Sequence, residues 1–487
     1  MQLSTITDET RLAFANLADR AAGVVTPSLR LGVTGLARSG KTVFIAALIH
    51  NLVHGGRLPL FKAYSGGRIT SAELQPQPDD DVPRFDYESH VRALVDERRW
   101  PESTRRISEL RLTIAYESAS FLRRTIGSGR LHLDIVDYPG EWLLDLPLLT
   151  RDYAEWSGAA IAAARAALNA ASAAPFLTRL AGTDPRAAED ETRARALAAD
   201  FTDHLRASRA AGEALSTEPP GRFLMPGDLE GSPALTFAPL DLKAGDLGPA
   251  NSLARMMARR YEAYKSVVVR PFFREHFARL DRQIVLVDML AALNRGPAAI
   301  AELEAALTGI LAAFRLGRTN WLSGLIARRI DRILFAATKA DHLHHDDHDR
   351  LEAMLGRLVG RAKAHAEFAG AKVDVLALAS VRATREGAVT TNRDRLPAII
   401  GTPLPGETVD GRTFDGDSEI AMFPGDLPKD PESIFEPAAR TGDGAPPLRF
   451  LRFRPPKLER TAEGLTLSLP HIRLDRALQF LVGDRLS

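Results

Sequence analysis

Cysteine is absent from all 487 residues, which excludes a disulfide scaffold, thiol catalysis and a cysteine-based zinc site. Net charge is nearly absent as well, because 63 basic and 62 acidic side chains leave a balance of +1. The chain therefore has no net electrostatic field that would attract nucleic acid or a membrane surface. No uninterrupted apolar run approaches the ~18 residues that a spanning helix needs, and the acidic N-terminus does not resemble a signal peptide. We expect a cytoplasmic protein with no nucleic-acid partner.

Hydrophobic residues make up 45% of the chain and charged residues 26%, which is the composition of an ordinary globular protein. The length is too great for one hydrophobic core. Two or three domains are expected.

The most informative stretch is Gly35–Thr42, GLARSGKT, which matches the pattern GxxxxGK[ST] without a gap. It lies between an apolar run and a helical pattern, the context of a phosphate-binding P-loop. Glycines let several backbone N–H groups point at phosphate oxygens, and the helix dipole adds positive charge. Lys41 can reach the β- and γ-phosphates. The residues expected to bind phosphate are Gly35, Ala37, Arg38, Ser39, Gly40, Lys41, Thr42 and Val43.

A magnesium site is predicted beside this loop. The Thr42 hydroxyl is one expected ligand, and Asp137, at the end of a predicted strand, is another through water. Asp137 also begins a DxxG pattern, whose Gly140 leaves its N–H free to approach a γ-phosphate. Thr104 could complete the metal shell as the effector-loop threonine, with Ser103 as its rival.

A base-recognition loop is predicted at Thr338-Lys339-Ala340-Asp341, again after a strand. It matches the guanine pattern [NT]KxD, in which the carboxylate accepts hydrogen bonds from guanine N1–H and N2–H₂, a pair that adenine lacks. The Lys339 stem can lie across the base. The expected base-binding residues also include His342 and, one strand later, Ser380, Val381 and Arg382.

Catalysis is expected from Lys41, Thr104, Arg38 and Glu141. Glu141 follows Gly140, where many small GTPases carry the glutamine that orients water. It could accept a proton from that water, or instead pair with an arginine of the helical region. Its negative charge near the γ-phosphate could be offset by Arg38, or by Arg105 or Arg106.

Four histidines, His342, His344, His345 and His348, cluster beside Asp346 and Asp347. A zinc site is one interpretation, although the spacing does not fix a tetrahedron. The other is a run of polar residues that begins a helix, where the two aspartates suit the positive N-terminus.

Strands and helices alternate along much of the chain, which predicts an α/β fold with a doubly wound, mostly parallel sheet. The sheet domain is expected over 28–142 and 282–390, interrupted by an Ala-rich helical insertion at 143–281. Residues 1–27 are expected to form an N-terminal helix, and 391–487 a small C-terminal domain.

These motifs resemble the YcjX-like family of bacterial P-loop GTPases. The resemblance is carried by GLARSGKT at 35–42, DYPGEW at 137–142, GRFLMPGDL at 221–229, TKADHLHH at 338–345 and ASVRAT at 379–384. It implies a Ras-like core that binds GTP and GDP with Mg²⁺ and hydrolyses GTP slowly, in a stress-linked role. It also implies a membrane-protein partner that could hold the chain at the inner membrane. That protein, or another protein partner, could bind through the helical insertion.

Other functions fit parts of the same pattern. A P-loop phosphotransferase or ATPase could use the helical block as a lid over its substrate, but the guanine-type loop would then be unexplained. A scaffold stabilised by bound nucleotide would carry the same binding motifs. The sequence does not separate a GTP-hydrolysing switch from such a scaffold, and it leaves the oligomeric state open.

Overall fold

The computed structural model describes most of the chain between residues 26 and 487, and it divides the chain into two compact units. The sheet unit comprises residues 1–138, 279–300 and 320–487, and the helical unit 139–278 and 301–319. The expected N-terminal helix lies outside the described residues. The residues that the structure describes are 26–36, 38–102, 106–119, 129–166, 170–210, 219–226, 229–242, 246–313, 330–391, 394–409, 411–435, 448, 450–458 and 468–487.

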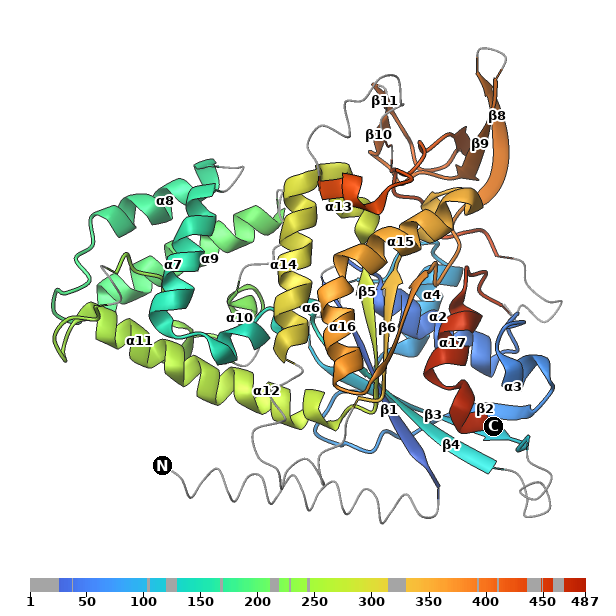
Figure 1. Ribbon diagram of the computed structural model, residues 1–487, viewed down its shortest axis with the longest axis horizontal. Coiled ribbons are helices and arrows are strands. Elements are labelled where there is room, and N and C mark those ends of the chain that lie inside the picture. The colour runs from blue at the N-terminus through green and yellow to red at the C-terminus, as the bar shows by residue number, and fades with distance from the viewer. Residues whose placement is uncertain are drawn as a thin grey trace. The chain divides into compact units, whose positions relative to one another are not determined.

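A seven-stranded sheet forms the centre of the sheet unit (Figure 1). Its strands β4, β1, β5, β6 and β7 are parallel, whereas β3 runs antiparallel to β4 and β2 antiparallel to β3. The α/β fold with a mostly parallel sheet is therefore confirmed. In spatial order the strands are β2 (Ile69–Gln75), β3 (Ser108–Tyr116), β4 (Gly129–Asp137), β1 (Ser28–Gly35), β5 (Arg282–Val287), β6 (Arg332–Ala337) and β7 (Lys372–Ala377).

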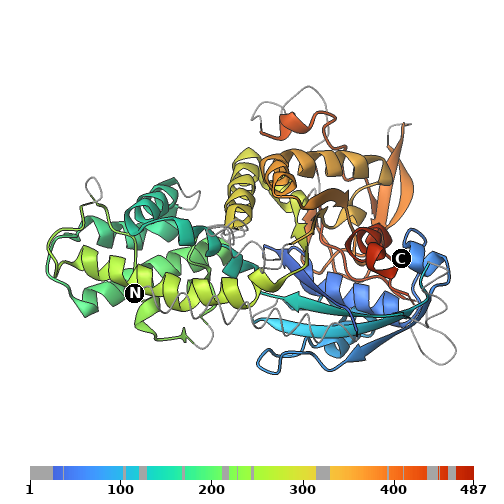
Figure 2. The ribbon, with the colours of Figure 1, turned by 60° about the horizontal axis from the view of Figure 1, so that its bottom comes forward.

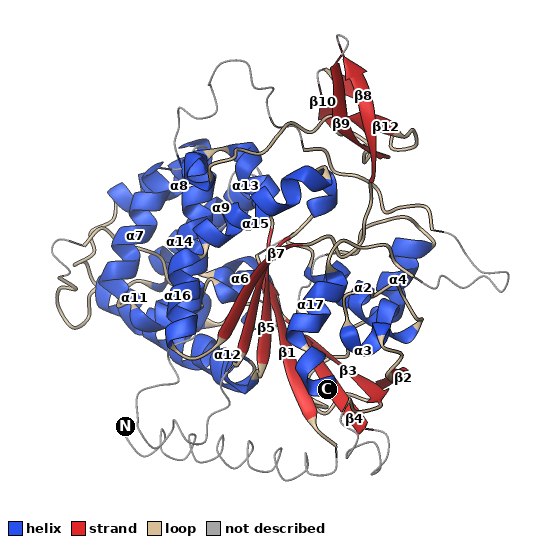
Figure 3. Ribbon diagram, turned by 45° about the vertical axis from the view of Figure 1, so that its right-hand side comes forward, coloured by secondary structure: helices blue, strands red, loops and turns tan. Residues whose placement is uncertain are grey.

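Helices cover both faces of this sheet. Figure 3 shows α16 and α17 on opposite sides of the strands. Alternate residues such as Leu31, Leu133 and Leu334 share a hydrophobic core with Leu474 and Leu478 of α17. The chain's last helix is thus part of the main core of the sheet unit. The helices described wholly within this unit are α2 (Lys41–Val53), α3 (Lys62–Ser65), α4 (Tyr87–Val95), α13 (Met289–Arg295), α15 (His348–Leu358), α16 (Gly360–Phe368) and α17 (Leu474–Leu481).

Short antiparallel strands follow the large sheet along the chain. One small sheet has the order β12-β9-β8, and β10 pairs with β11. Their bounds are β8 (Arg385–Thr391), β9 (Asp394–Gly401), β10 (Thr408–Val409), β11 (Arg412–Thr413) and β12 (Ile420–Met422).

The helical unit is drawn mainly in green in Figure 2. An aromatic core holds it together: the Trp156 and Tyr261 rings stack with centroids 5.2 Å apart, and Phe201 and Phe237 meet Trp156 edge-on. Its main helices are α6 (Gly140–Leu143), α7 (Tyr153–Ala166), α8 (Ala170–Ala181), α9 (Glu191–Ala210), α10 (Gly221–Leu224), α11 (Leu253–Tyr264) and α12 (Arg270–Glu275). Helix α14 (Pro297–Ala313) starts in the sheet unit and ends in the helical one.

Two local elements differ from what the residue pattern alone indicates. Residues 55–108 show no clear strand pattern in the sequence, yet β2 forms there and pairs with β3 at the edge of the sheet. Its sequence, ITSAELQ, is mostly exposed, so it lacks the strong apolar alternation that signals a half-buried strand. The helical sequence pattern over 347–366 forms two helices, because α15 ends before Val359 and α16 begins after it. Among the described residues, no helix is long and apolar enough to cross a membrane.

Candidate functional site

The predicted phosphate and base motifs leave the sheet at one edge. Strands β4, β1, β5, β6 and β7 are parallel, so their carboxyl ends lie in a row. Ligands of open α/β sheets bind outside such ends. In this row Asp137 ends β4, Gly35 ends β1, and the 338–342 and 380–382 segments follow β6 and β7.

The loop between β1 and α2 requires its two glycines for different reasons. A Cβ on Gly35 would lie 2.3 Å from the Ser39 Oγ and 2.5 Å from the Leu286 carbonyl oxygen, so no larger residue fits. Gly40 has a φ of +91° and no atom within 4 Å of where its Cβ would be. Glycine is favoured at this position by the backbone conformation and not by lack of space. The space beside Gly40 is open, next to the first backbone N–H groups of α2.

Polar groups of this loop are buried. The Lys41 Nζ donates to the Gly35 carbonyl oxygen at 3.0 Å and to that of Leu36 at 3.4 Å, and the residue is 7% exposed. The Ser39 Oγ is buried with no hydrogen-bond partner among the described residues. A folded-back ammonium and a buried hydroxyl at the start of a 13-residue helix suit a bound anion.

The predicted magnesium ligands fit that ion chemically. Thr42 and Asp137 are both buried at this edge of the sheet, with 7% and 1% of their surface exposed. A hydroxyl and a carboxylate are the hard oxygen donors that Mg²⁺ prefers. Ser103, Thr104 and Ala37 lie outside the described residues, so their roles stay predictions.

The 338–341 loop adopts an unusual backbone conformation. Lys339 has a φ of +62°, in the left-handed region that side chains rarely adopt, and its ammonium forms an ion pair with Asp288. Asp288 follows β5 and accepts a hydrogen bond from the Ala291 N–H at 3.1 Å, which caps α13. This pair fixes Lys339 against the neighbouring strand end.

Asp341 joins the two loops that the sequence assigns to the base. Its Oδ2 accepts a hydrogen bond from the Ala383 N–H at 2.8 Å, and the Thr384 hydroxyl donates to its backbone carbonyl. Asp341 as a whole is 4% exposed. The structure thus brings the 338–341 segment against the segment after β7.

The other predicted base-binding residues lie beside this junction. Burial lowers the pKa of the His342 imidazole, which keeps the ring neutral near pH 7, and the ring meets Phe453 edge-on at 5.4 Å. Ser380 and Val381 are buried, and the Arg382 N–H donates to the Pro470 carbonyl at 2.7 Å. Their contacts with a base stay predictions.

Gly140 and Glu141 begin α6 in the helical unit, and both are buried. The boundary between the two units falls between Tyr138 and Pro139, inside the DxxG pattern. Within the helical unit, the Glu141 carbonyl oxygen would lie 1.8 Å from a Cβ at Gly221. The 140–145 segment is therefore packed tightly against 220–222.

Sequence reasoning missed Asp288 as the partner of Lys339, and Ala383 and Thr384 as the partners of Asp341. A signal existed for Asp288, because it lies at the carboxyl end of a strand, as Asp137 does: Asp288 directly follows β5, and Asp137 is the last residue of β4. Which acidic residue faces Lys339 depends on β5 and β6 being neighbours.

Comparison with known proteins agrees with this geometry. Residues 29–486 match the model of the YcjX-like family, DUF463. The chain is 39% identical to the Ras-like GTPase YcjX of Escherichia coli K12, over 94% of this chain and 96% of that protein. It is 35% identical to the Ras-like GTPase YcjX of Shewanella oneidensis MR-1, over 100% and 99%. The predicted Ras-like P-loop fold is confirmed, and the chain belongs to the YcjX-like family.

Proposed function

We propose that the chain binds guanine nucleotide and hydrolyses GTP to GDP and phosphate with Mg²⁺. The observation that carries the proposal is that both predicted nucleotide-binding loops lie at the carboxyl ends of the parallel strands. The glycine loop after β1 and the Asp341 loop after β6 leave parallel strands on the same side, separated by the single strand β5. The name of the two relatives, Ras-like GTPase, supports the same activity.

The phosphate end would be held by the loop after β1. Backbone N–H groups at the start of α2 and the Lys41 ammonium would neutralise the β- and γ-phosphates. The hydroxyl of Thr42 and the carboxylate of Asp137 would hold Mg²⁺, which supplies charge neutralisation when bound. The buried hydroxyl of Ser39 supports this assignment, because a bound anion would satisfy it.

The base end would be read by Asp341. Its hydrogen bond from Ala383 and the bond from Thr384 to its carbonyl hold the residue in one orientation. A carboxylate fixed in this way would accept from guanine N1–H and N2–H₂ and would stay unpaired against adenine. Such a mismatch rejects the wrong substrate by roughly 10³-fold or more.

Hydrolysis needs a water that attacks the γ-phosphorus while the bond to the β–γ bridging oxygen breaks. The proton from that water ends on the released phosphate. We assign the orientation of the water to Glu141, because it follows the DxxG glycine. The unit boundary falls inside the same motif, so contacts at Gly140 would act at the root of the helical unit. This supports a nucleotide-dependent switch.

The biological setting in this proposal comes from the family resemblance. It includes a bacterial stress response and a membrane-protein partner that contacts the helical unit. A pull-down from membrane extracts with the protein loaded with GTP or with GDP tests it. Enrichment of one membrane protein in only one nucleotide state is expected.

Phosphate release from GTP and from ATP, measured side by side with and without Mg²⁺, tests the activity. We expect release from GTP only, abolished by chelation of Mg²⁺. Equal turnover of ATP would favour the phosphotransferase or ATPase interpretation. Tight GDP binding with no phosphate release, even with a membrane fraction added, would favour the scaffold.

A further inference from the structure

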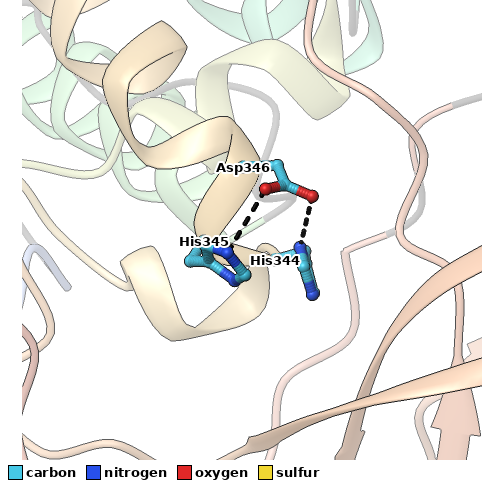
Figure 4. Close-up of side chains that lie close together, drawn as sticks. All are labelled: His344, His345 and Asp346. Atoms are coloured by element: carbon cyan, nitrogen blue, oxygen red, sulfur yellow. Dashed lines mark ion pairs between the residues drawn. The ribbon is translucent and has the colours of Figure 1, made fainter.

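Two histidines and an aspartate meet just after the Asp341 loop. Figure 4 shows the His344 and His345 rings, with centroids 4.3 Å apart, both facing the Asp346 carboxylate. The His344 Nδ1 lies 2.9 Å from one oxygen of that carboxylate, and the His345 Nε2 lies 3.3 Å from the other. One ligand atom from each of the three residues lies within 4.8 Å of the others.

A fourth group comes from another segment. Glu386 of β8 places its Oε2 2.8 Å from the His345 Nδ1 and 3.9 Å from the His344 Nε2. Each ring therefore turns one nitrogen toward Asp346 and the other toward Glu386. Histidines that ligate a metal ordinarily donate their second ring N–H to a carboxylate in this way.

The contact between His344 and Asp346 is not a hydrogen bond. The His344 Nδ1 is buried and has no hydrogen-bond partner among the described residues, although a carboxylate oxygen lies 2.9 Å away. A short distance without hydrogen-bond geometry is expected of two atoms that share a cation. Zinc bonds of about 2.0–2.1 Å in tetrahedral coordination place neighbouring ligands about 3.3 Å apart.

We propose that His344 Nδ1, His345 Nε2 and the Asp346 carboxylate bind a divalent transition metal such as Zn²⁺. Glu386 is the positioning residue that accepts the second ring N–H of His345. Imidazole and carboxylate ligands suit Zn²⁺, and three protein ligands leave one position for water. This site is separate from the proposed Mg²⁺ ligands, Thr42 in the first turn of α2 and Asp137 at the end of β4.

The metal would tie together the two segments that Asp341 already joins. His344 lies three residues after Asp341, and Glu386 lies two residues after Thr384. A bound metal would stiffen both sides of the base loop and so strengthen guanine-nucleotide binding. This coupling depends on the proposed function, whereas metal binding itself does not.

The competing explanation is a set of surface ion pairs. Glu386 also contacts the Arg382 guanidinium at 3.3 Å, and the side chains of His345 and Asp346 are 61% and 64% exposed. Exposed pairs of this kind contribute little to stability. If these residues form only surface ion pairs, replacing them should change neither the Zn²⁺ affinity nor the nucleotide affinity of the chain.

Titration calorimetry of the full chain with ZnCl₂ separates these explanations. We expect one site in the wild type, lost in His345→Ala and weakened about tenfold in Glu386→Gln. His365→Ala, which removes a histidine from α16 outside the cluster, should bind Zn²⁺ as the wild type does. Because His345 is exposed, circular dichroism should show an unchanged fold. Equal Zn²⁺ binding by all four proteins, or none by the wild type, would overturn the site.

A second titration tests the coupling. GDP affinity should rise when Zn²⁺ is added to the wild type and to His365→Ala, but not when it is added to His345→Ala. A wild type that binds Zn²⁺ without any change in GDP affinity would refute the coupling. A protein that binds Zn²⁺ at this site but binds no guanine nucleotide would refute the proposed function and leave the metal site standing.

Discussion

Tyr264 donates a hydrogen bond of 2.6 Å to the carboxylate of Asp145, a fully buried acid four residues after Glu141. The same carboxylate accepts from the backbone N–H groups of Gly221 at 2.7 Å and Arg222 at 3.3 Å. The acid, which lies two residues after the end of α6, thus joins this segment to α10 and α11 of the helical unit. Asp145 itself lies five residues after Gly140 of the DxxG motif.

The first prediction concerns pH. Burial raises the pKa of Asp145 from 3.8 to about 6, against the lowering effect of the Tyr264 hydrogen bond. Because this pKa is raised on folding, the carboxyl group keeps its proton up to a higher pH in the folded state than in the unfolded state. Stability from this group is therefore complete below pH 4 and is lost between about pH 4 and 6, by about 3 kcal/mol.

Asp145→Asn cannot ionise and should flatten this pH dependence. Tyr264→Phe keeps the acid but removes the hydroxyl that lowers its pKa, so the total loss should be larger and should extend to higher pH. Melting temperatures of both variants and the wild type at several values between pH 4 and 7, followed by tryptophan fluorescence, provide the check. Parallel curves for all three proteins would refute this role for Asp145.

The second prediction compares two glycines of the helical unit. Gly221→Ala would force a Cβ against the Glu141 carbonyl oxygen, at 1.8 Å, and should cost about 1–3 kcal/mol of stability. Gly158 lies on the exposed face of α7, and a Cβ added there would have no atom within 4 Å, so Gly158→Ala meets no obstacle. It should stabilise the helix by about 0.5–1 kcal/mol. Chemical denaturation would measure both, and the prediction is wrong if both changes have the same sign.

The third prediction concerns the phosphate loop. Lys41→Ala should weaken GDP binding by about 10- to 100-fold or more, because a charge-assisted bond to phosphate is lost. Thr42→Ala should mainly remove the Mg²⁺ dependence of binding. Lys62→Ala, which deletes an exposed lysine of α3, is the control and should bind normally. Wild-type affinity in the first two variants, measured by calorimetry, would exclude the P-loop assignment.

The fourth prediction concerns base choice. The wild type should bind GDP roughly 10³-fold or more tightly than ADP. Asp341→Asn should weaken GDP and admit xanthosine diphosphate, whose base offers a carbonyl where guanine has an amine. Asp349→Asn, a neutralisation of an exposed acid in α15, should leave base choice unchanged. Equal affinity of the wild type for ADP and GDP would refute the assignment.

The fifth prediction concerns Glu141. If its carboxylate orients water, Glu141→Ala should lower turnover by about 10²-fold or more with little change in GTP affinity. If instead it pairs with an arginine and holds the helical unit together, the variant should melt early. Hydrolysis at the wild-type rate in a variant of lowered melting temperature would dismiss the catalytic role.

Much of the fold could be predicted because strong signals are local. The strand that ends at Gly35 is buried along nearly its whole length and contains the apolar run Leu31–Val33. Helix α2 is apolar on nearly every face because it is almost entirely buried. The edge strand β2 escaped prediction because its mostly exposed residues carry little alternation. Exposure weakens the pattern that sequence reasoning uses.

The sequence by itself determined the predicted phosphate loop, the predicted base loop and their order along the chain, because each motif needs fixed residue types at short spacing. The tertiary structure decided which distant groups face each other. Asp288 reaches Lys339, and Glu386 reaches His345, because the sheet order and the turn into β8 bring their segments together. Such contacts join residues 41 to 51 positions apart. No local spacing encodes them, since they arise only once the strands have paired.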